Sequence, residues 1–195
     1  MKVAKREHGF TLVEMIGVLA VIAILASVAA PRIFDAIEDA KVSNFVQQVK
    51  TLETAVAKFN ADTSRWPRMY PTSDASTAPH NHQLLINAVN AAGDAIANWR
   101  GPYLQKNLVN PFSATAYQAL YNTSDGRWAC DVDGDGTSDG QFLVYRADGI
   151  TDKIAEKISG VLDSDAGTAN WKTQGRVKRY NGTHTSILAV CLARV

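Results

Sequence analysis

A large net charge and catalytic motifs are both missing from this chain of 195 residues. Its 20 Lys and Arg nearly balance 19 Asp and Glu, which leaves a formal net charge of +1. A near-neutral chain has no general electrostatic attraction to nucleic acid, and we interpret the densest basic cluster, residues 176–179, as a solvated strand face. No serine or cysteine stands in a nucleophile motif, and no phosphate-binding glycine loop is followed by a lysine. The sequence therefore predicts no enzyme and no specific nucleic-acid partner.

Charge is almost absent from residues 10–30, whose only ionisable side chain is Glu14. As a helix, this run would rise about 31 Å and match the hydrocarbon thickness of a bilayer. The short flank before it holds Lys2, Lys5 and Arg6, and such a basic flank stays on the cytoplasmic side. A carboxylate inside a membrane-compatible helix is costly unless it finds a partner, so Glu14 marks a functional position.

The start of the chain resembles that of type IV pilins and type II secretion pseudopilins. The shared features are a basic leader that ends in Gly9, the run Phe-Thr-Leu-Val-Glu from Phe10 to Glu14, and a proline at Pro31. The resemblance implies that a prepilin peptidase cleaves after Gly9 and methylates the amine of Phe10. It also implies assembly, in which Glu14 pairs with the Phe10 amine of a neighbouring copy, and a helix kink or local melting at Pro31.

This resemblance divides the chain into three parts. Residues 1–9 would be the cleaved leader, residues 10–30 the transmembrane and filament-core helix, and residues 31–195 a pilin-like head. Before assembly the protein would cross the bacterial inner membrane once, in contact with lipid, with its head in the periplasm. Its partners would be further copies in a helical filament, prepilin peptidase, an inner-membrane assembly platform and other pilins or pseudopilins.

Other readings of the N-terminus remain open. An ordinary secretory signal peptide or an uncleaved signal anchor would also begin with a basic flank and an apolar run, although neither accounts for Glu14. A membrane-anchored, calcium-dependent binding module that never polymerises is the main alternative function, and an anchored hydrolase is a more distant one.

The predicted fold class is α+β and pilin-like, with a long N-terminal helix packed on a small antiparallel sheet. Apolar residues recur near every 3.6 positions up to residue 61, so the amphipathic second half of the helix belongs to the head. Similar patterns predict short helices at residues 84–96 and 151–162, and strands at residues 116–121, 141–146, 176–180 and 185–193.

The chain contains only two cysteines, Cys130 and Cys191. Both lie in the part that would face an oxidising exterior, so a disulfide between them is the favoured state. It would close a loop of about 60 residues and stabilise the head by about 4 kcal/mol in the chain-entropy description. An intermolecular bridge is the alternative.

Aspartates alternate directly after Cys130 in a pattern similar to an EF-hand loop. Asp131, Asp133, Asp135 and Asp139 take positions 1, 3, 5 and 9, and Thr137 takes the position of the backbone carbonyl ligand. Calcium takes oxygen ligands of this kind. Major pseudopilins, which this chain resembles, use calcium to order their heads. Position 12 is Phe142 instead of a glutamate, so the loop is incomplete, and Asp125, Asp148 or Asp152 are candidates for closing the shell. The alternative is a solvated Asp/Gly turn.

Overall fold

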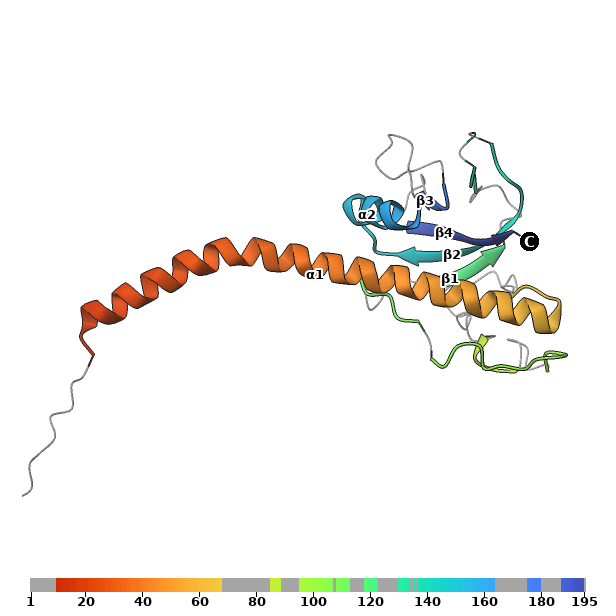
Figure 1. The fold of residues 1–195 in the computed structure, drawn as a ribbon, viewed down its shortest axis with the longest axis horizontal. Helices are drawn as coiled ribbons and strands as arrows, with labels where there is room; N and C mark the ends of the chain where they lie inside the picture. Colours follow the sequence, from red (N-terminus) through yellow and green to blue (C-terminus); the bar gives the residue numbers. More distant parts are fainter. Residues whose placement is uncertain are drawn as a thin grey trace, which may run out of the picture. The chain divides into compact units, whose positions relative to one another are not determined.

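The computed structural model describes ten stretches of the chain, and Figure 1 draws their fold. These stretches are residues 10–67, 85–88, 95–106, 108–112, 118–122, 130–133, 135, 137–163, 175–179 and 187–194. The chain divides into two compact units, residues 1–40 and residues 41–195, which we call the anchor unit and the head. The predicted leader, residues 1–9, lies outside the described residues.

The helix α1, Leu12–Thr63, contains 52 residues and confirms the predicted long helix. Pro31 lies inside it, and the residues on both sides are α-helical, so the local melting considered for this position does not occur. The helix ends where Ser64 takes a positive φ of 52°, and its amide donates to the carbonyl of Asn60 at 2.8 Å. This left-handed residue stops the helical repeat.

Four strands form one antiparallel sheet in the order β1-β2-β4-β3. The strands are β1 (Gln118–Asn122), β2 (Phe142–Asp148), β3 (Val177–Arg179) and β4 (Ile187–Arg194). Each overlaps a strand predicted from the sequence, and the α+β pilin-like class is confirmed. The chain passes between β2 and β3 through α2, Asp152–Leu162, which confirms the predicted short helix.

The sheet buries side chains on both of its faces. Leu188 and Val190 of β4 join the main core, whereas Ile187, Ala189 and Cys191 form a second cluster with Cys130, Phe142 and Val144. Alternate residues of a strand point to opposite faces, so one strand supplies both clusters. The uninterrupted apolar run of β4 is explained by this double burial.

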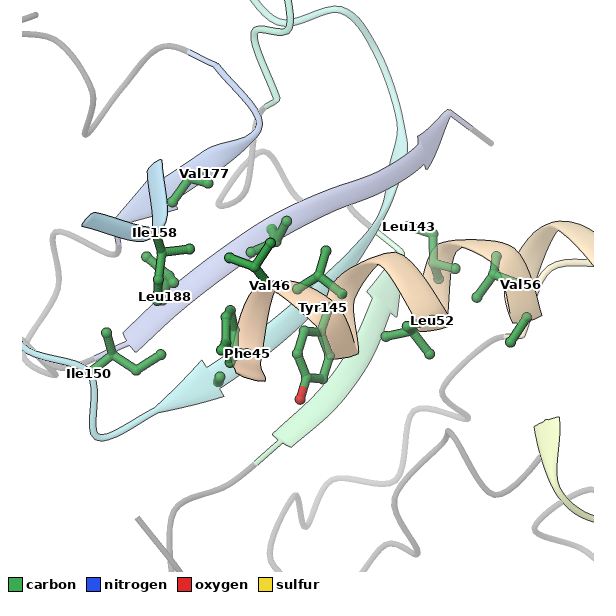
Figure 2. Close-up of a cluster of buried hydrophobic side chains, with 14 of the residues drawn as sticks. Phe45, Val46, Leu52, Val56, Leu143, Tyr145, Ile150, Ile158, Val177 and Leu188 are labelled. Atoms are coloured by element: carbon green, nitrogen blue, oxygen red, sulfur yellow. The ribbon is translucent and has the colours of Figure 1, made fainter. Parts of the chain in front are cut away.

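The main core joins the head half of α1 to the sheet and α2, as Figure 2 shows. Phe45, Leu52 and Val56 of α1 are at most 1% exposed, and they pack with Leu143 and Tyr145 of β2. The rings of Phe45 and Tyr145 stack with their centroids 5.8 Å apart. The amphipathic pattern of the helix therefore marks the face that the sheet covers.

The second predicted helix, residues 84–96, is not found where the structure describes it. Leu85 to Ala88 make a single turn, and Ile96 donates its amide to the carbonyl of Ala88 at 2.8 Å, a spacing that no α-helix has. The carbonyl of Leu85 accepts from the amides of Tyr103 and Leu104 at 2.7 and 3.0 Å. The Leu85 carbonyl therefore accepts from residues far away in the chain, and not from the amide four residues later as the predicted helix would require. Most of residues 84–96 lie outside the described part.

We expect the head to lose stability at alkaline pH through Tyr145. Burial raises the pKa of Tyr145 above the ordinary value of 10.0. The unfolded chain therefore releases this proton first as the pH rises, and the free energy of unfolding falls above pH 10 by up to about 1.4 kcal/mol per pH unit. Urea unfolding of the full chain in detergent between pH 8 and 11 would measure this. The Tyr145→Phe variant should lose less stability over the same range, and an identical pH dependence of the two proteins would contradict the prediction.

Candidate functional site

The anchor unit exposes a long series of large apolar side chains. Leu12 and Val13 are 74% and 78% exposed, and the series continues to Ile33, Phe34 and Ile37. Among the described residues, α1 is the one helix long and apolar enough to cross a membrane, and its most apolar window is not buried within the protein. So large an apolar surface needs lipid or another protein surface to cover it.

Glu14 and Thr11 form the first hydrogen bonds of α1. The Glu14 carboxylate accepts from the backbone amide and the hydroxyl of Thr11, both at 2.8 Å, and the Thr11 hydroxyl accepts from the Glu14 amide at 3.3 Å. This reciprocal arrangement is a capping box, in which the residue before the helix and the third helical residue bond to each other. Within a single chain, Glu14 therefore caps the N-terminal end of α1 together with Thr11, and Phe10 directly precedes this cap.

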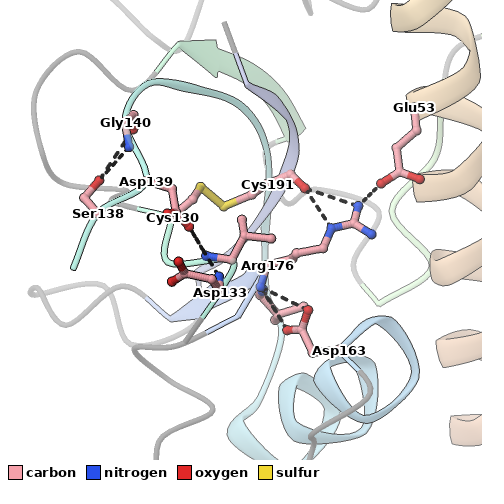
Figure 3. Close-up of a disulfide and its surroundings, with 11 residues drawn as sticks. Glu53, Cys130, Asp133, Ser138, Asp139, Gly140, Asp163, Arg176 and Cys191 are labelled. Atoms are coloured by element: carbon pink, nitrogen blue, oxygen red, sulfur yellow. Dashed lines mark hydrogen bonds and ion pairs between the residues drawn. A yellow bond between two sulfur atoms is a disulfide. The ribbon is translucent and has the colours of Figure 1, made fainter. Parts of the chain in front are cut away.

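The second site lies at the far face of the sheet, around the disulfide between Cys130 and Cys191 (Figure 3). The predicted pairing is confirmed, with the two Cα atoms 6.3 Å apart. Cys191 belongs to β4, and the carbonyl of Cys130 accepts from the amide of Asp139 at 2.8 Å. The disulfide thus attaches the start of the acidic loop, residues 131–139, to β4, and the hydrogen bond from Asp139 holds the end of this loop at Cys130.

Three of the four predicted loop carboxylates converge. One oxygen from each of Asp131, Asp133 and Asp139 lies within 4.8 Å of the others, and we call this set the acidic cluster. Asp135 and Thr137 instead bond to each other, since the Asp135 carboxylate accepts from the Thr137 amide and hydroxyl at 2.7 and 2.6 Å. These bonds stabilise the charged carboxylate and lower the pKa of Asp135.

Of the three suggested closing ligands, Asp148 and Asp152 do not join the acidic cluster. Asp148 forms two hydrogen bonds of 2.7 Å with Arg146, and Asp152 pairs with Arg179 at 2.6 Å. Asp125 lies outside the described residues. Within the part of the chain that the structure describes, the cluster offers three carboxylates, fewer than the six to eight oxygens that calcium takes, and further oxygens would have to supply the rest.

Lys178 is the neighbour that the sequence did not suggest. It is only 5% exposed, so the expected solvated strand face is wrong for this residue. Burial lowers the pKa of Lys178, and the nearby charges of Asp131, Asp163 and Asp139 act in the opposite direction. Its ammonium group therefore offsets part of the negative charge of the acidic cluster.

Asp163 and Arg176 connect this region to α1. The Asp163 carboxylate accepts from the backbone amides of Arg176 and Val177 at 3.0 to 3.1 Å. The Arg176 guanidinium donates to the Cys191 carbonyl at 3.3 Å and pairs with Glu53 of α1 (Figure 3). Arg176, which directly precedes β3, therefore bonds to groups within the head, as does Arg179 of β3 through its pair with Asp152.

Gly175 permits the close approach of Asp163. Its φ is +84°, and a Cβ at this position would lie 2.5 Å from Asp163 Oδ2. Its amide also donates to the carbonyl of Asp131 at 2.7 Å, which joins the acidic loop to the start of β3. A lone glycine in a polar stretch was the only sequence signal for this junction.

Comparison with known proteins agrees with this architecture. Residues 4–30 match the prokaryotic N-terminal methylation motif, and residues 32–142 match the family of type II secretion system (T2SS), protein G. Together with the exposed apolar helix and the helix-on-sheet head, these matches define a pilin-like protein. The chain belongs to the protein G family of type II secretion systems.

Several relatives carry related names. The type II secretion system core protein G of Aeromonas hydrophila is 27% identical over 69% of this chain and 90% of its own length. The Escherichia coli core protein G is 27% identical over 68% and 92%, and fimbrial protein Q of Moraxella bovis is 30% identical over 66% and 87%. No solved structure shows a significant match. These relatives are pilin and pseudopilin subunits, which suggests that this chain is not an enzyme.

We expect the disulfide to supply much of the stability of the head. A Cys130→Ser/Cys191→Ser variant should lose about 4 kcal/mol in the free energy of unfolding, because the unfolded chain gains the freedom of a loop of 61 residues. Urea unfolding followed by tryptophan fluorescence would measure the loss. Dithiothreitol should lower the urea midpoint of the parent protein and leave that of the variant unchanged. A parent midpoint that resists full reduction would contradict the prediction.

Proposed function

We propose that this protein is a structural subunit of a type II secretion pseudopilus or a type IV pilus-like filament. The supporting observation is the anchor unit, an apolar helix exposed along its length that carries one carboxylate near its start. In the inner membrane, lipid would cover this helix, and the head would lie in the periplasm. In the filament, the helices of other copies would replace the lipid.

Processing would prepare the helix for this exchange. Cleavage after Gly9 by prepilin peptidase creates a positive amine at Phe10, four residues before Glu14. In a water-poor helical bundle, the Glu14 carboxylate of one copy would neutralise the Phe10 amine of the next, so that neither charge is buried alone. Until then, the bonds from Thr11 hold the carboxylate in place.

The filament's role would be mechanical. A pseudopilus would grow from an inner-membrane assembly platform, with other pseudopilins, and push exported proteins through the outer membrane. The match of residues 32–142 to protein G favours this system over a surface pilus. Energy for assembly would come from another protein, because this sequence has no nucleotide-binding motif.

Substitution of Glu14 separates its two roles. We expect Glu14→Ala and Glu14→Gln both to abolish filaments, because each leaves the Phe10 amine without a counter-ion. Glutamine can still accept from the Thr11 amide, so Glu14→Gln retains the helix cap. Electron microscopy of cells with equal membrane levels of each variant would measure assembly.

Normal filaments from Glu14→Gln would show that the cap, and not the charge, is required. Mass spectrometry of the mature N-terminus provides the second measurement, with Phe10 plus one methyl group as the expected result. A mature protein that keeps residues 1–9 and forms no filaments would instead support a non-polymerising membrane-anchored module.

We also propose that the acidic loop binds calcium. Asp131, Asp133 and Asp139 supply three converging carboxylates, and their mutual repulsion favours a cation. Lys178 lowers the net charge at the site, so the affinity should be weaker than three carboxylates alone would give. Calcium would fix the loop that the disulfide attaches to β4.

Calcium should raise the melting temperature of the full chain in detergent, since a ligand specific to the folded state stabilises it by about 2.7 kcal/mol at 100 times its dissociation constant. Asp133→Asn should weaken this effect, because it removes one carboxylate from the acidic cluster. The matched control is Glu156→Gln, which removes an exposed carboxylate of α2. A melting temperature that does not respond to calcium would refute the site.

A further inference from the structure

Three charged residues are buried near one another at the start of β3. Asp131, Asp163 and Lys178 are only 4%, 8% and 5% exposed. Gly175 contacts both acids, because its amide donates to the Asp131 carbonyl at 2.7 Å and a Cβ on it would lie 2.5 Å from Asp163 Oδ2. The charges of both carboxylates act on the ammonium group of Lys178. Two buried acids and one buried base therefore meet at the edge of the acidic loop.

Burial makes these charges depend on one another. A charge that is taken out of water is strongly unfavourable unless an opposite charge or hydrogen bonds compensate it. The Asp163 carboxylate accepts from the amide of Val177, which compensates part of its charge. Asp131 belongs to the acidic cluster, where the carboxylates of Asp133 and Asp139 repel its charge. A buried cation beside Asp131 is therefore of greater consequence than one beside Asp163.

The remaining loop carboxylates accept hydrogen bonds from the loop itself. The Asp139 carboxylate accepts from the backbone amides of Val132 and Asp133 (Figure 3). The Asp133 carboxylate accepts from the amide of Asp135 at 3.2 Å. These bonds fold the loop with groups of the chain alone, and hydrogen bonds of this kind stabilise the charged form of a carboxylate.

We propose that Lys178 is the resident cation of the acidic loop, which keeps the loop folded without calcium and competes with calcium for Asp131. The calcium half of this inference rests on the proposed function. Lys178 reaches the loop because the bridge between Asp131 and Gly175 joins the loop to the start of β3. A cation attached to the chain is present at a high effective concentration, so calcium would add less order here than in a loop without the lysine.

A double-mutant cycle in the presence of EDTA tests the role of the lysine. Lys178→Met removes the charge and keeps a long side chain, so it should lower the melting temperature of the full chain in detergent by leaving Asp131 uncompensated. Asp131→Asn should lower the melting temperature of the parent and raise that of Lys178→Met, because it then removes an unpaired buried charge. The matched control is Lys50→Met, which removes an exposed lysine of α1 and should have no effect.

The double variant also separates charge from packing. If Lys178→Met does not fold in EDTA and Asp131→Asn/Lys178→Met does, the inference is supported, because the unpaired charge and not the lost side chain prevents folding. If neither variant folds, the lysine serves packing and the inference is overturned. It is equally overturned if Asp131→Asn lowers the melting temperature by the same amount in both backgrounds.

Calcium titration by calorimetry tests the competition. Lys178→Met should bind calcium about tenfold more tightly than the parent, because a positive charge beside a divalent cation is removed. Calcium should also restore the melting temperature that this variant loses in EDTA. Equal calcium affinities of the parent and Lys178→Met would overturn the competition while the calcium site stands. If neither protein binds calcium, the proposed calcium site and the competition both fail, and the cycle in EDTA still decides whether Lys178 is the cation of the loop.

Discussion

One helix has to satisfy two different surroundings, and the remainder of the structure follows from that constraint. The anchor half of α1 exposes apolar side chains such as Leu12 and Val13, which water solvates poorly. The head half buries one face, including Phe45 and Leu52, against the sheet. α1 runs without interruption through Pro31, and the head keeps a core of its own. In the proposed function, a subunit would therefore exchange lipid for a helical bundle without unfolding its head.

The head achieves this independence by burying its sheet on both faces. On one face, α1 and α2 cover Leu188 and Val190. On the other face, Cys130 packs with the residues around Cys191. Arg176 crosses between these layers, because its side chain reaches Glu53 of α1 while its backbone amide bonds to Asp163. A small sheet thereby gains a second buried layer and a covalent attachment without a larger helical framework.

Charge inside the head is arranged in balanced groups. The acidic cluster faces a buried lysine, and Asp163 accepts bonds from successive amides at the start of β3. The basic residues of the stretch 176–179 accordingly pair with carboxylates or lie buried, because Arg176 pairs with Glu53, Arg179 pairs with Asp152 and Lys178 is 5% exposed. It also limits a bound cation to the residual negative charge of the loop. The part of the head beyond residue 142, which includes Lys178 and Cys191, lies outside the match to protein G.

The sequence by itself determined the long helix, its apolar run, the strands and α2, because periodicity and length are local properties. It favoured a bridge between its only two cysteines, and the structure decided that this bridge lies within one chain. It also placed Asp131, Asp133 and Asp139 in one loop. Only the tertiary structure decided that residues 85–88 form a turn, that Asp135 bonds to Thr137, and that Lys178 lies beside the acidic cluster. The turn and the place of Lys178 depend on partners far away in the chain, namely the amides of Tyr103 and Leu104 and the sheet that buries Lys178, and no local pattern records such partners. The bond between Asp135 and Thr137 is local, but the alternation of aspartates did not distinguish it from a metal-ligand position.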